Sequence, residues 1–252
     1  GAAFNASKLP TVIPWKGFTD QWFIALYNDT RIWVAVRNTV LVAIAVVIIA
    51  VPVGAAGAIL VNSISGRVRA ILYGMMVAPI LVPGVVIGIS TLLFWHQFSV
   101  GSGLHLSVLG QVSYIASFVM LLVLARLQSF DQGLEEAALD LGASHGQVMR
   151  RILLPHLYPA LGAGAAISFF QSIENFNVTL FTRGGADTLT VYVFSKVRSG
   201  ITPTINALAL LLIMVTLVLA VIYEINRRRK ARIEAAREAE GRRAEDAELI
   251  AS

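Results

Sequence analysis

The chain has 252 residues and a formal net charge of +5, yet only 14% of its residues are charged and 56% are hydrophobic. A water-soluble domain of this length carries roughly 25% charged residues, so the composition excludes a fully solvated surface and indicates an integral membrane protein. The chain has no cysteine, which excludes a disulfide framework, a thiol nucleophile and a cysteine-bound metal.

Residues 1–37 precede the first long apolar stretch, and we expect them to form an extracytoplasmic segment. Trp15, Trp22 and Tyr27 lie within this segment. Aromatic side chains of this kind favour the interface between membrane and water. The segment is therefore expected to rest on the outer surface of the membrane.

Residues 38–226 are expected to form the membrane domain, because they contain five apolar stretches. A helix needs roughly 20 residues to cross the hydrocarbon core of a bilayer. The stretches cover residues 38–61, 70–95, 108–127, 157–181 and 204–225. Only helices and closed barrels satisfy all backbone hydrogen bonds in lipid, so the sequence predicts an all-α polytopic bundle with five spans.

The second and third stretches carry features that a plain lipid-facing helix lacks. Pro79 and Pro83 interrupt the second, and a proline removes one hydrogen bond from the helix. Two interpretations stay open: the freed carbonyls line a cavity, or the prolines only kink the helix to fit a neighbour. The third stretch has Gln111, Ser113 and Tyr114 in its first half, which predicts contact with protein or water.

Between the third and fourth stretches, residues 130–156 have mixed polarity and predict two short helices joined by a sharp corner. Asp131 suits the positive N-terminal end of the first helix. Gly142 stands where that helix is expected to stop, in a conformation that often needs a positive φ. Ser144 with Gln147 forms a capping box for the second helix. This helix is expected to run up to Pro155, which opens the next span.

The fourth stretch gathers polar residues within a short segment. These are Ser168, Gln171, Ser172, Glu174, Asn175 and Asn177. An ionised carboxylate in bare hydrocarbon costs at least about 2.5 kcal/mol, so we expect Glu174 to face a watery cavity or to pair with a cation. Gln171, Glu174 and Asn175, with Pro79 and Pro83, are the candidate translocation path. Alternatively, Glu174 and Asn175 only form hydrogen bonds that fix helix packing.

Residues 227–252 form a charged tail that holds eight basic residues. Placing this tail in the cytoplasm puts thirteen of the 20 basic residues on the inner side and seven on the outer side, as the positive-inside rule favours. The basic residues concentrate at the membrane flank, so no nucleic-acid partner is expected. Five spans with the tail inside leave Gly1 outside, and we therefore expect a further upstream helix and six spans in the full protein.

The sequence of the 130–156 loop resembles the EAA loop of binding-protein-dependent ABC importer permeases. The match consists of Glu136-Ala137-Ala138, three residues, Gly142, nine residues, then Ile152-x-Leu154-Pro155. All seven signature positions have the family spacing. The order of the spans, Ala125-Arg126-Leu127 and Pro203-x-x-Asn206-Ala207-Leu208 resemble the second permease subunit of spermidine/putrescine-type importers.

The resemblance implies an all-α, MetI-like permease bundle, multi-pass in the bacterial inner (plasma) membrane. It implies that one set of residues contacts a separate ATPase: Glu136, Ala137, Ala138, Gly142, Ile152, Leu154 and Pro155. The implied partners are two ATPase subunits that bind ATP and Mg, a second permease subunit, an extracytoplasmic solute-binding protein and membrane lipid. This chain has no phosphate-binding loop of the G-x-x-x-x-G-K-[ST] type, and we expect no enzyme activity and no cofactor or metal in it.

The resemblance also implies the solute, a polyamine or a related amine-bearing metabolite. Polyamine-type permeases carry an acidic pair where Glu174-Asn175 stands, and often an acid where Ile80 stands. An opine or amino-acid-like solute therefore stays open on the same architecture. An ion-coupled secondary transporter is the alternative of a different class. A short amphipathic helix over residues 189–198 is a candidate platform for the solute-binding protein.

Overall fold

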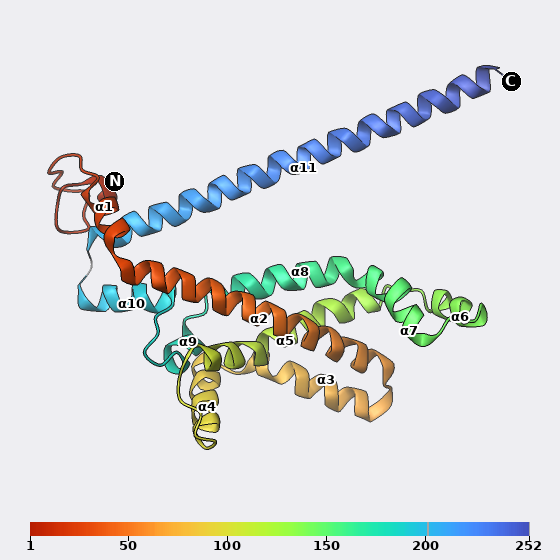
Figure 1. Ribbon diagram of the computed structural model, residues 1–252, viewed down its shortest axis with the longest axis horizontal. Helices are drawn as coiled ribbons and strands as arrows, with labels where there is room; N and C mark the ends of the chain where they lie inside the picture. The colour runs from red at the N-terminus through yellow and green to blue at the C-terminus, as the bar shows by residue number, and fades with distance from the viewer. Residues whose placement is uncertain (201, 252) are drawn as a thin grey trace. The chain divides into compact units, whose positions relative to one another are not determined.

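A computed structural model describes the backbone of residues 1–200 and 202–251, and their side chains except at positions 132, 219, 220 and 230–251. The elements are helices (Figure 1), and the prediction of an all-α fold is confirmed. In chain order they are η1 (Ala2–Phe4), α1 (Gln21–Asn28), α2 (Thr30–Ser63), α3 (Gly66–Leu81), α4 (Gly84–His96), α5 (Leu104–Leu127), α6 (Gln132–Asp140), α7 (His145–Val148), the π turn η2 (Met149–Leu153), α8 (Leu154–Ile173), α9 (Asn177–Thr182), α10 (Leu189–Ser199) and α11 (Pro203–Ala251).

Four helical runs are long and apolar enough to cross a membrane: Thr30–Ser63, Leu104–Leu127, His145–Ile173 and Pro203–Arg229. The bent pair of α3 and α4 gives a fifth crossing if it counts as one span. These correspond to the five predicted stretches. The first begins at Thr30 rather than at residue 38, because the Asp29 carboxylate accepts the Arg31 N–H at 3.1 Å and caps the helix there.

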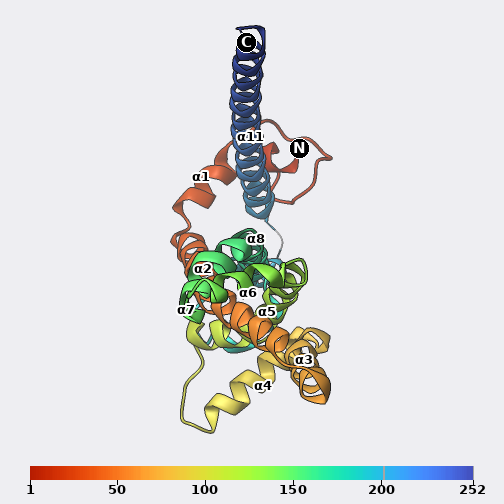
Figure 2. The ribbon, with the colours of Figure 1, turned by 90° about the vertical axis from the view of Figure 1, so that its right-hand side faces the viewer.

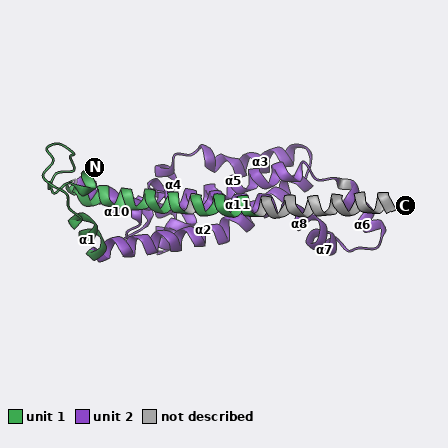
Figure 3. Ribbon diagram, turned by 90° about the horizontal axis from the view of Figure 1, so that it is seen from above, with its two compact units in different colours: residues 1–28, 199–252 green, residues 29–198 purple. Residues whose placement is uncertain are grey.

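The chain divides into two compact units, residues 29–198 and residues 1–28 with 199–252 (Figure 3). In the first unit, α2, α5 and α8 lie side by side (Figures 1 and 2). A Cβ at Gly54 of α2 would lie 2.5 Å from the Ala116 carbonyl oxygen of α5, so the missing side chain permits this close crossing. Val119, Met120 and Leu157 are fully buried between the three helices.

The second predicted stretch is not one continuous helix, because α3 and α4 meet at an angle of 106°. Val82 has extended backbone, with φ −85° and ψ 129°, as a residue before proline prefers. The carbonyl oxygen of Pro79 accepts the Val82 N–H at 3.3 Å, and that of Pro83 accepts the Val86 N–H at 2.9 Å. Pro83 leaves the Pro79 carbonyl without its helical donor, and the Val82 N–H uses that carbonyl instead; the prolines bend the chain here, and a lining role for them stays open.

The fourth predicted stretch, 157–181, also breaks, and this corrects the expected place of Glu174. Helix α8 ends at Ile173 with Glu174 as its C-cap, and α9 starts at Asn177. Glu174 therefore lies at the end of a span, in a break of the helix, and not well inside it. The sequence shows no glycine or proline between 171 and 182, so no local signal marks this break.

The start of this span differs from the prediction as well. Helices α7 and α8 and the π turn η2 form one continuous run, His145–Ile173. Pro155 stands in the first turn of α8, as predicted, but the helical run itself begins ten residues earlier, at His145. The π turn covers Met149–Leu153, and its wider backbone loosens the hydrogen-bond ladder where Pro155 has no N–H to donate.

In the second unit, α1 and η1 contact α11. The segment after η1 folds around the buried Asn5, whose amide nitrogen donates to the Thr11 and Pro14 carbonyls at 2.9 and 3.1 Å. The indole N–H of Trp22 donates to the Asn5 carbonyl at 2.8 Å. Helix α11 continues to Ala251. The side chains of the tail from residue 230 onward lie outside the described residues.

Candidate coupling loop and translocation pocket

The loop after α5 is a helical hairpin with a glycine corner. Asp131 caps α6, since its Oδ1 accepts the Gly133 N–H at 2.9 Å. The helix ends at Asp140, and Gly142 then has φ +84°. This left-handed conformation costs other residues about 1–2 kcal/mol, so glycine permits the chain to turn here.

The second arm of the hairpin begins at a capping box. Ser144 Oγ accepts the Gln147 N–H at 3.3 Å, and Gln147 Oε1 accepts the Ser144 N–H at 2.8 Å. The predicted pair of short helices with a sharp corner is therefore confirmed.

The signature residues of the loop lie mostly at its surface. Glu136, Ala137, Gly142 and Pro155 are exposed, while Ala138, Ile152 and Leu154 are half-buried. At the corner, the Leu141 side chain is 89% exposed. A hollow of about 330 Å³ adjoins it, lined by Leu141, Gly142, Ala143, Gln147, Val148, Arg151 and Ile152.

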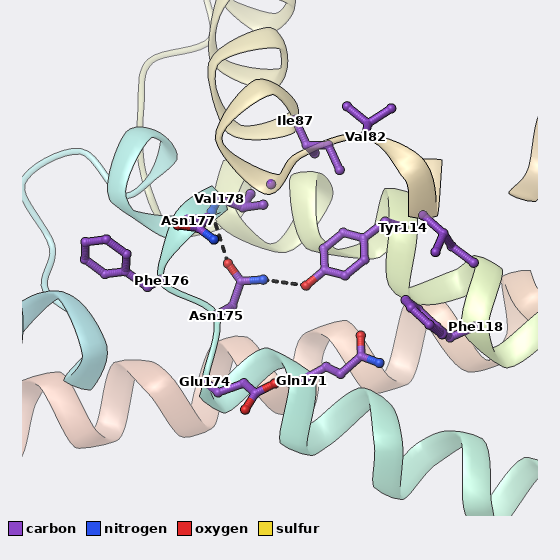
Figure 4. Close-up of a pocket in the computed structure, with 12 residues that line it drawn as sticks. Val82, Ile87, Tyr114, Phe118, Gln171, Glu174, Asn175, Phe176, Asn177 and Val178 are labelled. Atoms are coloured by element: carbon purple, nitrogen blue, oxygen red, sulfur yellow. Dashed lines mark hydrogen bonds between the residues drawn. The ribbon is translucent and has the colours of Figure 1, made fainter. Parts of the chain in front are cut away.

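A pocket of about 430 Å³ lies where α4, α5 and the α8–α9 break meet (Figure 4). Its lining residues are Ile80, Val82, Gly84, Ile87, Tyr114, Phe118, Gln171, Glu174, Asn175, Phe176, Asn177 and Val178. Of the five residues predicted for the path, Gln171, Glu174 and Asn175 line this pocket. Pro79 and Pro83 flank the lining residues Ile80 and Val82, and they shape the wall through the α3–α4 bend.

The pocket carries one carboxylate, that of Glu174, among its lining residues. In the described part of the chain, neither this carboxylate nor the Gln171 amide has a hydrogen-bond partner. Glu174 is exposed. A carboxylate without a protein partner is satisfied by water or by a cation, so the pocket can accept a positively charged group.

Asn175 plays a different part, because its amide is used inside the protein. Its Nδ2 donates to the Tyr114 hydroxyl at 2.5 Å, and its Oδ1 accepts the Val178 N–H at 3.2 Å (Figure 4). Asn175 thereby fixes the Tyr114 ring and the first turn of α9. Of the polar residues predicted for the path, Glu174 and Gln171 keep free side-chain groups.

Sequence reasoning missed the aromatic wall of the pocket. Tyr114, Phe118 and Phe176 line it, and only Tyr114 drew notice, as a polar residue in an apolar stretch. Aromatic residues are common throughout membrane helices, so only the three-dimensional contacts distinguish the lining pair Phe118 and Phe176.

The loop and the pocket are separate sites at the two ends of one helical run. The run His145–Ile173 starts at the second arm of the loop and ends directly before Glu174. It has 29 residues, and at a rise of 1.5 Å per residue this corresponds to about 43 Å. One helical run therefore connects the loop with the pocket.

On the side of the pocket away from the loop, ionic contacts attach α10 to the start of α2. The Asp29 carboxylate accepts a hydrogen bond from the Tyr192 hydroxyl and lies 3.3 Å from Lys196 Nζ. Burial raises the pKa of Asp29, but the hydrogen bonds from Tyr192 and Lys196 together lower this pKa below its ordinary value. Burial and the neighbouring Asp29 raise the pKa of Tyr192. The predicted short helix over 189–198 is confirmed as α10.

Comparison with known proteins assigns the family. Residues 50–232 match the family described as "Binding-protein-dependent transport system inner membrane component". The chain is 29% identical over 231 residues to the spermidine/putrescine transport system permease protein PotC of Escherichia coli strain K12, covering 91% of this chain and 87% of PotC. It is 33% identical over 220 residues to the putrescine transport system permease protein PotI of the same strain, covering 84% and 77% of the two chains.

Solved structures agree on the fold. A bacterial ABC transporter that imports the acidic polysaccharide alginate superposes with a TM-score of 0.71 at 17% identity, over 86% of this chain and 85% of that one. The methionine transporter MetNI gives a TM-score of 0.58 at 20% identity, over 80% and 94% of the chains. The family match and the relatives PotC and PotI set aside the alternative of an ion-coupled secondary transporter. This chain belongs to the binding-protein-dependent inner membrane permeases, the non-catalytic subunits of ABC importers whose ATPase is a separate subunit.

Proposed function

We propose that the pocket at the α8–α9 break is part of the translocation path and that its solute is a polyamine or a small amine-bearing metabolite. The observation that carries this proposal is the Glu174 carboxylate, which stands at the pocket wall without a hydrogen-bond partner in the described chain. The relatives PotC and PotI, named for spermidine and putrescine transport, support it.

The rest of the lining suits an alkyl amine. An ammonium group pairs with Glu174, and it is also attracted to the face of an aromatic ring. Tyr114, Phe118 and Phe176 offer such rings. The methylene chain of the solute would lie against Ile80 and Ile87 on the opposite wall. One charged group among mostly apolar neighbours permits binding that is specific and still weak enough for release.

The loop over residues 131–155 is the contact with the ATPase in this proposal. Glu136, Ala137, Ala138 and Gly142 face a separate ATPase subunit, and the exposed Leu141 gives the surface an apolar centre. Two ATPases with ATP and Mg, a second permease subunit and an extracytoplasmic binding protein complete the importer. Closure of the ATPases tilts the loop, and the helical run His145–Ile173 transmits this tilt to Glu174.

The test is Glu174→Gln in the assembled importer, reconstituted in liposomes with its binding protein, with labelled putrescine as the probe. Removing the carboxylate removes an ion pair at a partly hydrated site, so the initial uptake rate is expected to fall about fivefold to tenfold. Glu224→Gln is the matched control. It removes the same charge from a residue that pairs with Arg227 and Arg228 and does not line the pocket.

Two results would count against the proposal. Uptake kinetics that are unchanged in assembled Glu174→Gln complexes would remove Glu174 from the path. An opine or amino-acid-like solute would appear as stimulation of ATP hydrolysis by zwitterions and none by putrescine, and this would replace the polyamine assignment.

A further inference from the structure

A buried amide from α5 connects the two sides of the helix break that carries Glu174. Ser172, at the end of α8, donates from its Oγ to Gln111 Oε1 at 2.5 Å. Gln111 Nε2 in turn donates to Thr179 Oγ1 of α9 at 2.9 Å. Gln111 is 1% exposed, and its two partners are 4% and 1% exposed. Gln111 is not among the pocket-lining residues.

A second contact, one helical turn away on the same face of α5, repeats the connection. The hydroxyls of Ser107 and Thr182 form a hydrogen bond of 2.9 Å, and Thr182 Oγ1 also donates to the Val178 carbonyl at 2.9 Å. Ser107 and Thr182 are both fully buried. Polar groups buried away from water are costly when unpaired, so these pairings favour a single arrangement of α9 against α5.

The hydrogen bonds of Gln111 to Ser172 and Thr179 lie on either side of Glu174, the residue on which the proposed function depends. Glu174 follows Ser172 by two residues and precedes Thr179 by five, and the intervening residues 174–176 are not helical. The backbone bonds that reach into the break from α8 are the Glu174 N–H to the Phe170 carbonyl at 3.2 Å and the Asn175 N–H to the Ser172 carbonyl at 3.3 Å, and side-chain contacts add to them. Here Gln111 fixes both ends, while Asn175 bonds to Tyr114 from within the break.

We propose that Gln111 is a positioning residue for solute transport: by bridging Ser172 and Thr179 it fixes the α8–α9 break and thereby holds Glu174 at the pocket wall. This inference rests on the proposed function of the pocket. The Gln111 amide does not line the pocket, and by this inference it affects solute binding indirectly.

The first test measures the break itself, by hydrogen–deuterium exchange on the complete importer in lipid nanodiscs. Gln111→Met keeps the shape of the side chain and removes both hydrogen bonds. Amide exchange in the peptide over residues 172–180 is expected to become about tenfold faster, because fewer buried hydrogen bonds then oppose local opening of the backbone. Thr179→Val, which removes one of the two bonds, is expected to give a smaller increase and serves if Gln111→Met does not assemble.

Ser113→Ala is the matched control. Ser113 lies two residues further along α5, but its hydroxyl donates to the Gly110 carbonyl of its own helix at 2.7 Å, so exchange at 172–180 is expected to stay at the wild-type rate. Exchange that is unchanged in both Gln111→Met and Thr179→Val would overturn the inference.

The second test asks whether Gln111 acts through Glu174, by a double-mutant cycle on uptake of labelled putrescine. Gln111→Met alone is expected to raise KM severalfold with a smaller effect on kcat. Added to Glu174→Gln it is expected to change kcat/KM by less than about twofold, since the group that it positions is already gone. Multiplicative effects would show a general structural role and overturn the inference. Equal uptake by wild type and Glu174→Gln would instead overturn the assignment of the pocket to the path. The exchange experiment does not depend on uptake, so it tests the role of Gln111 separately from the assignment of the pocket.

Discussion

Gly142 at the corner of the coupling loop and Glu174 at the break of α8 and α9 show two ways in which one residue sets the geometry of a site. Gly142 acts through its backbone, because φ +84° suits a residue without a Cβ. Glu174 acts through its charge, which the described protein leaves without a hydrogen-bond partner. The first residue needs no partner to do its work, whereas the second depends on contacts from α5 that hold its backbone.

The backbone role of Gly142 leads to a prediction for Gly142→Ala. No atom lies within 4 Å of a Cβ built at this position, so the substitution adds only the strain of a positive φ, about 1–2 kcal/mol. The importer is expected to assemble, while uptake and ATPase stimulation by the loaded binding protein both fall severalfold. Parallel assays of membrane insertion, ATP hydrolysis and uptake check this.

Gly146→Ala is the control for this substitution. Its Cβ would meet only Ser144 Oγ at 4.0 Å, and Gly146 is not among the glycines with positive φ. Wild-type coupling in Gly142→Ala would show that the corner tolerates strain and that its conformation does not matter for contact with the ATPase.

Among the elements, the helical hairpin of the coupling loop was predictable in detail because local chemistry fixes it. Asp131, Gly142 and the pair Ser144 and Gln147 each act on backbone groups within three residues of themselves. A reader of the sequence can therefore place the helix ends. The same holds for the four long apolar runs, whose composition alone indicates a membrane crossing.

The break between α8 and α9 was not predictable, because the contacts on its two sides come from residues far away in the sequence. Gln111 is 61 residues from Ser172 and 68 from Thr179, and no glycine or proline between residues 171 and 182 marks the end of a helix. The sequence could place Glu174 among polar neighbours, but it could not show that α8 stops beside it. The pocket residues Phe118 and Phe176 were missed for the same reason.

The attachment of α10 to α2 leads to a prediction about pH. The pKa of Asp29 is lowered from 3.8, so its contribution to stability is present above that pH and is lost as pH falls through the lower folded value. The pKa of Tyr192 is raised from 10.0, so its contribution is complete below that pH and is lost only at higher pH. The contribution of the Asp29–Tyr192 contact to stability is therefore expected to be constant from about pH 4 to about pH 10.

Tyr192→Phe tests this attachment by removing the hydroxyl that bonds to Asp29. A hydrogen bond to a charged, partly solvated group contributes about 1 kcal/mol, which lowers the melting temperature of the purified complex by about 2–4 °C. The difference from wild type is expected to stay flat between pH 5 and 9 and to shrink below about pH 4. Tyr158→Phe, at an exposed tyrosine of α8, is expected to have no effect. A difference that changes near pH 6 or 7 would mean that another group controls the contact.

For the whole molecule, the decisive property is its direction in the membrane, since the proposed contact with the ATPase needs the loop on the cytoplasmic side. In the unit formed by residues 29–198, α7 and α10 lie at opposite ends (Figure 1). The distribution of basic residues places the end with α7 in the cytoplasm. In the proposed mechanism, the helical run His145–Ile173 therefore transmits movement from the loop on the cytoplasmic side to the pocket.

The absence of cysteine from the chain makes this direction directly measurable. Gly185→Cys lies between α9 and α10, and Gly146→Cys lies in α7; a Cβ meets nothing closer than 4.0 Å at either position. A membrane-impermeant maleimide is expected to label Gly185→Cys in intact cells stripped of their outer membrane, and Gly146→Cys only in inverted vesicles. Gly162→Cys, within the apolar run of α8, is expected to react slowly in both preparations. Labelling of Gly146→Cys from the outside would place the loop where no ATPase can reach it, and neither the proposed coupling nor the path through the pocket would survive that result.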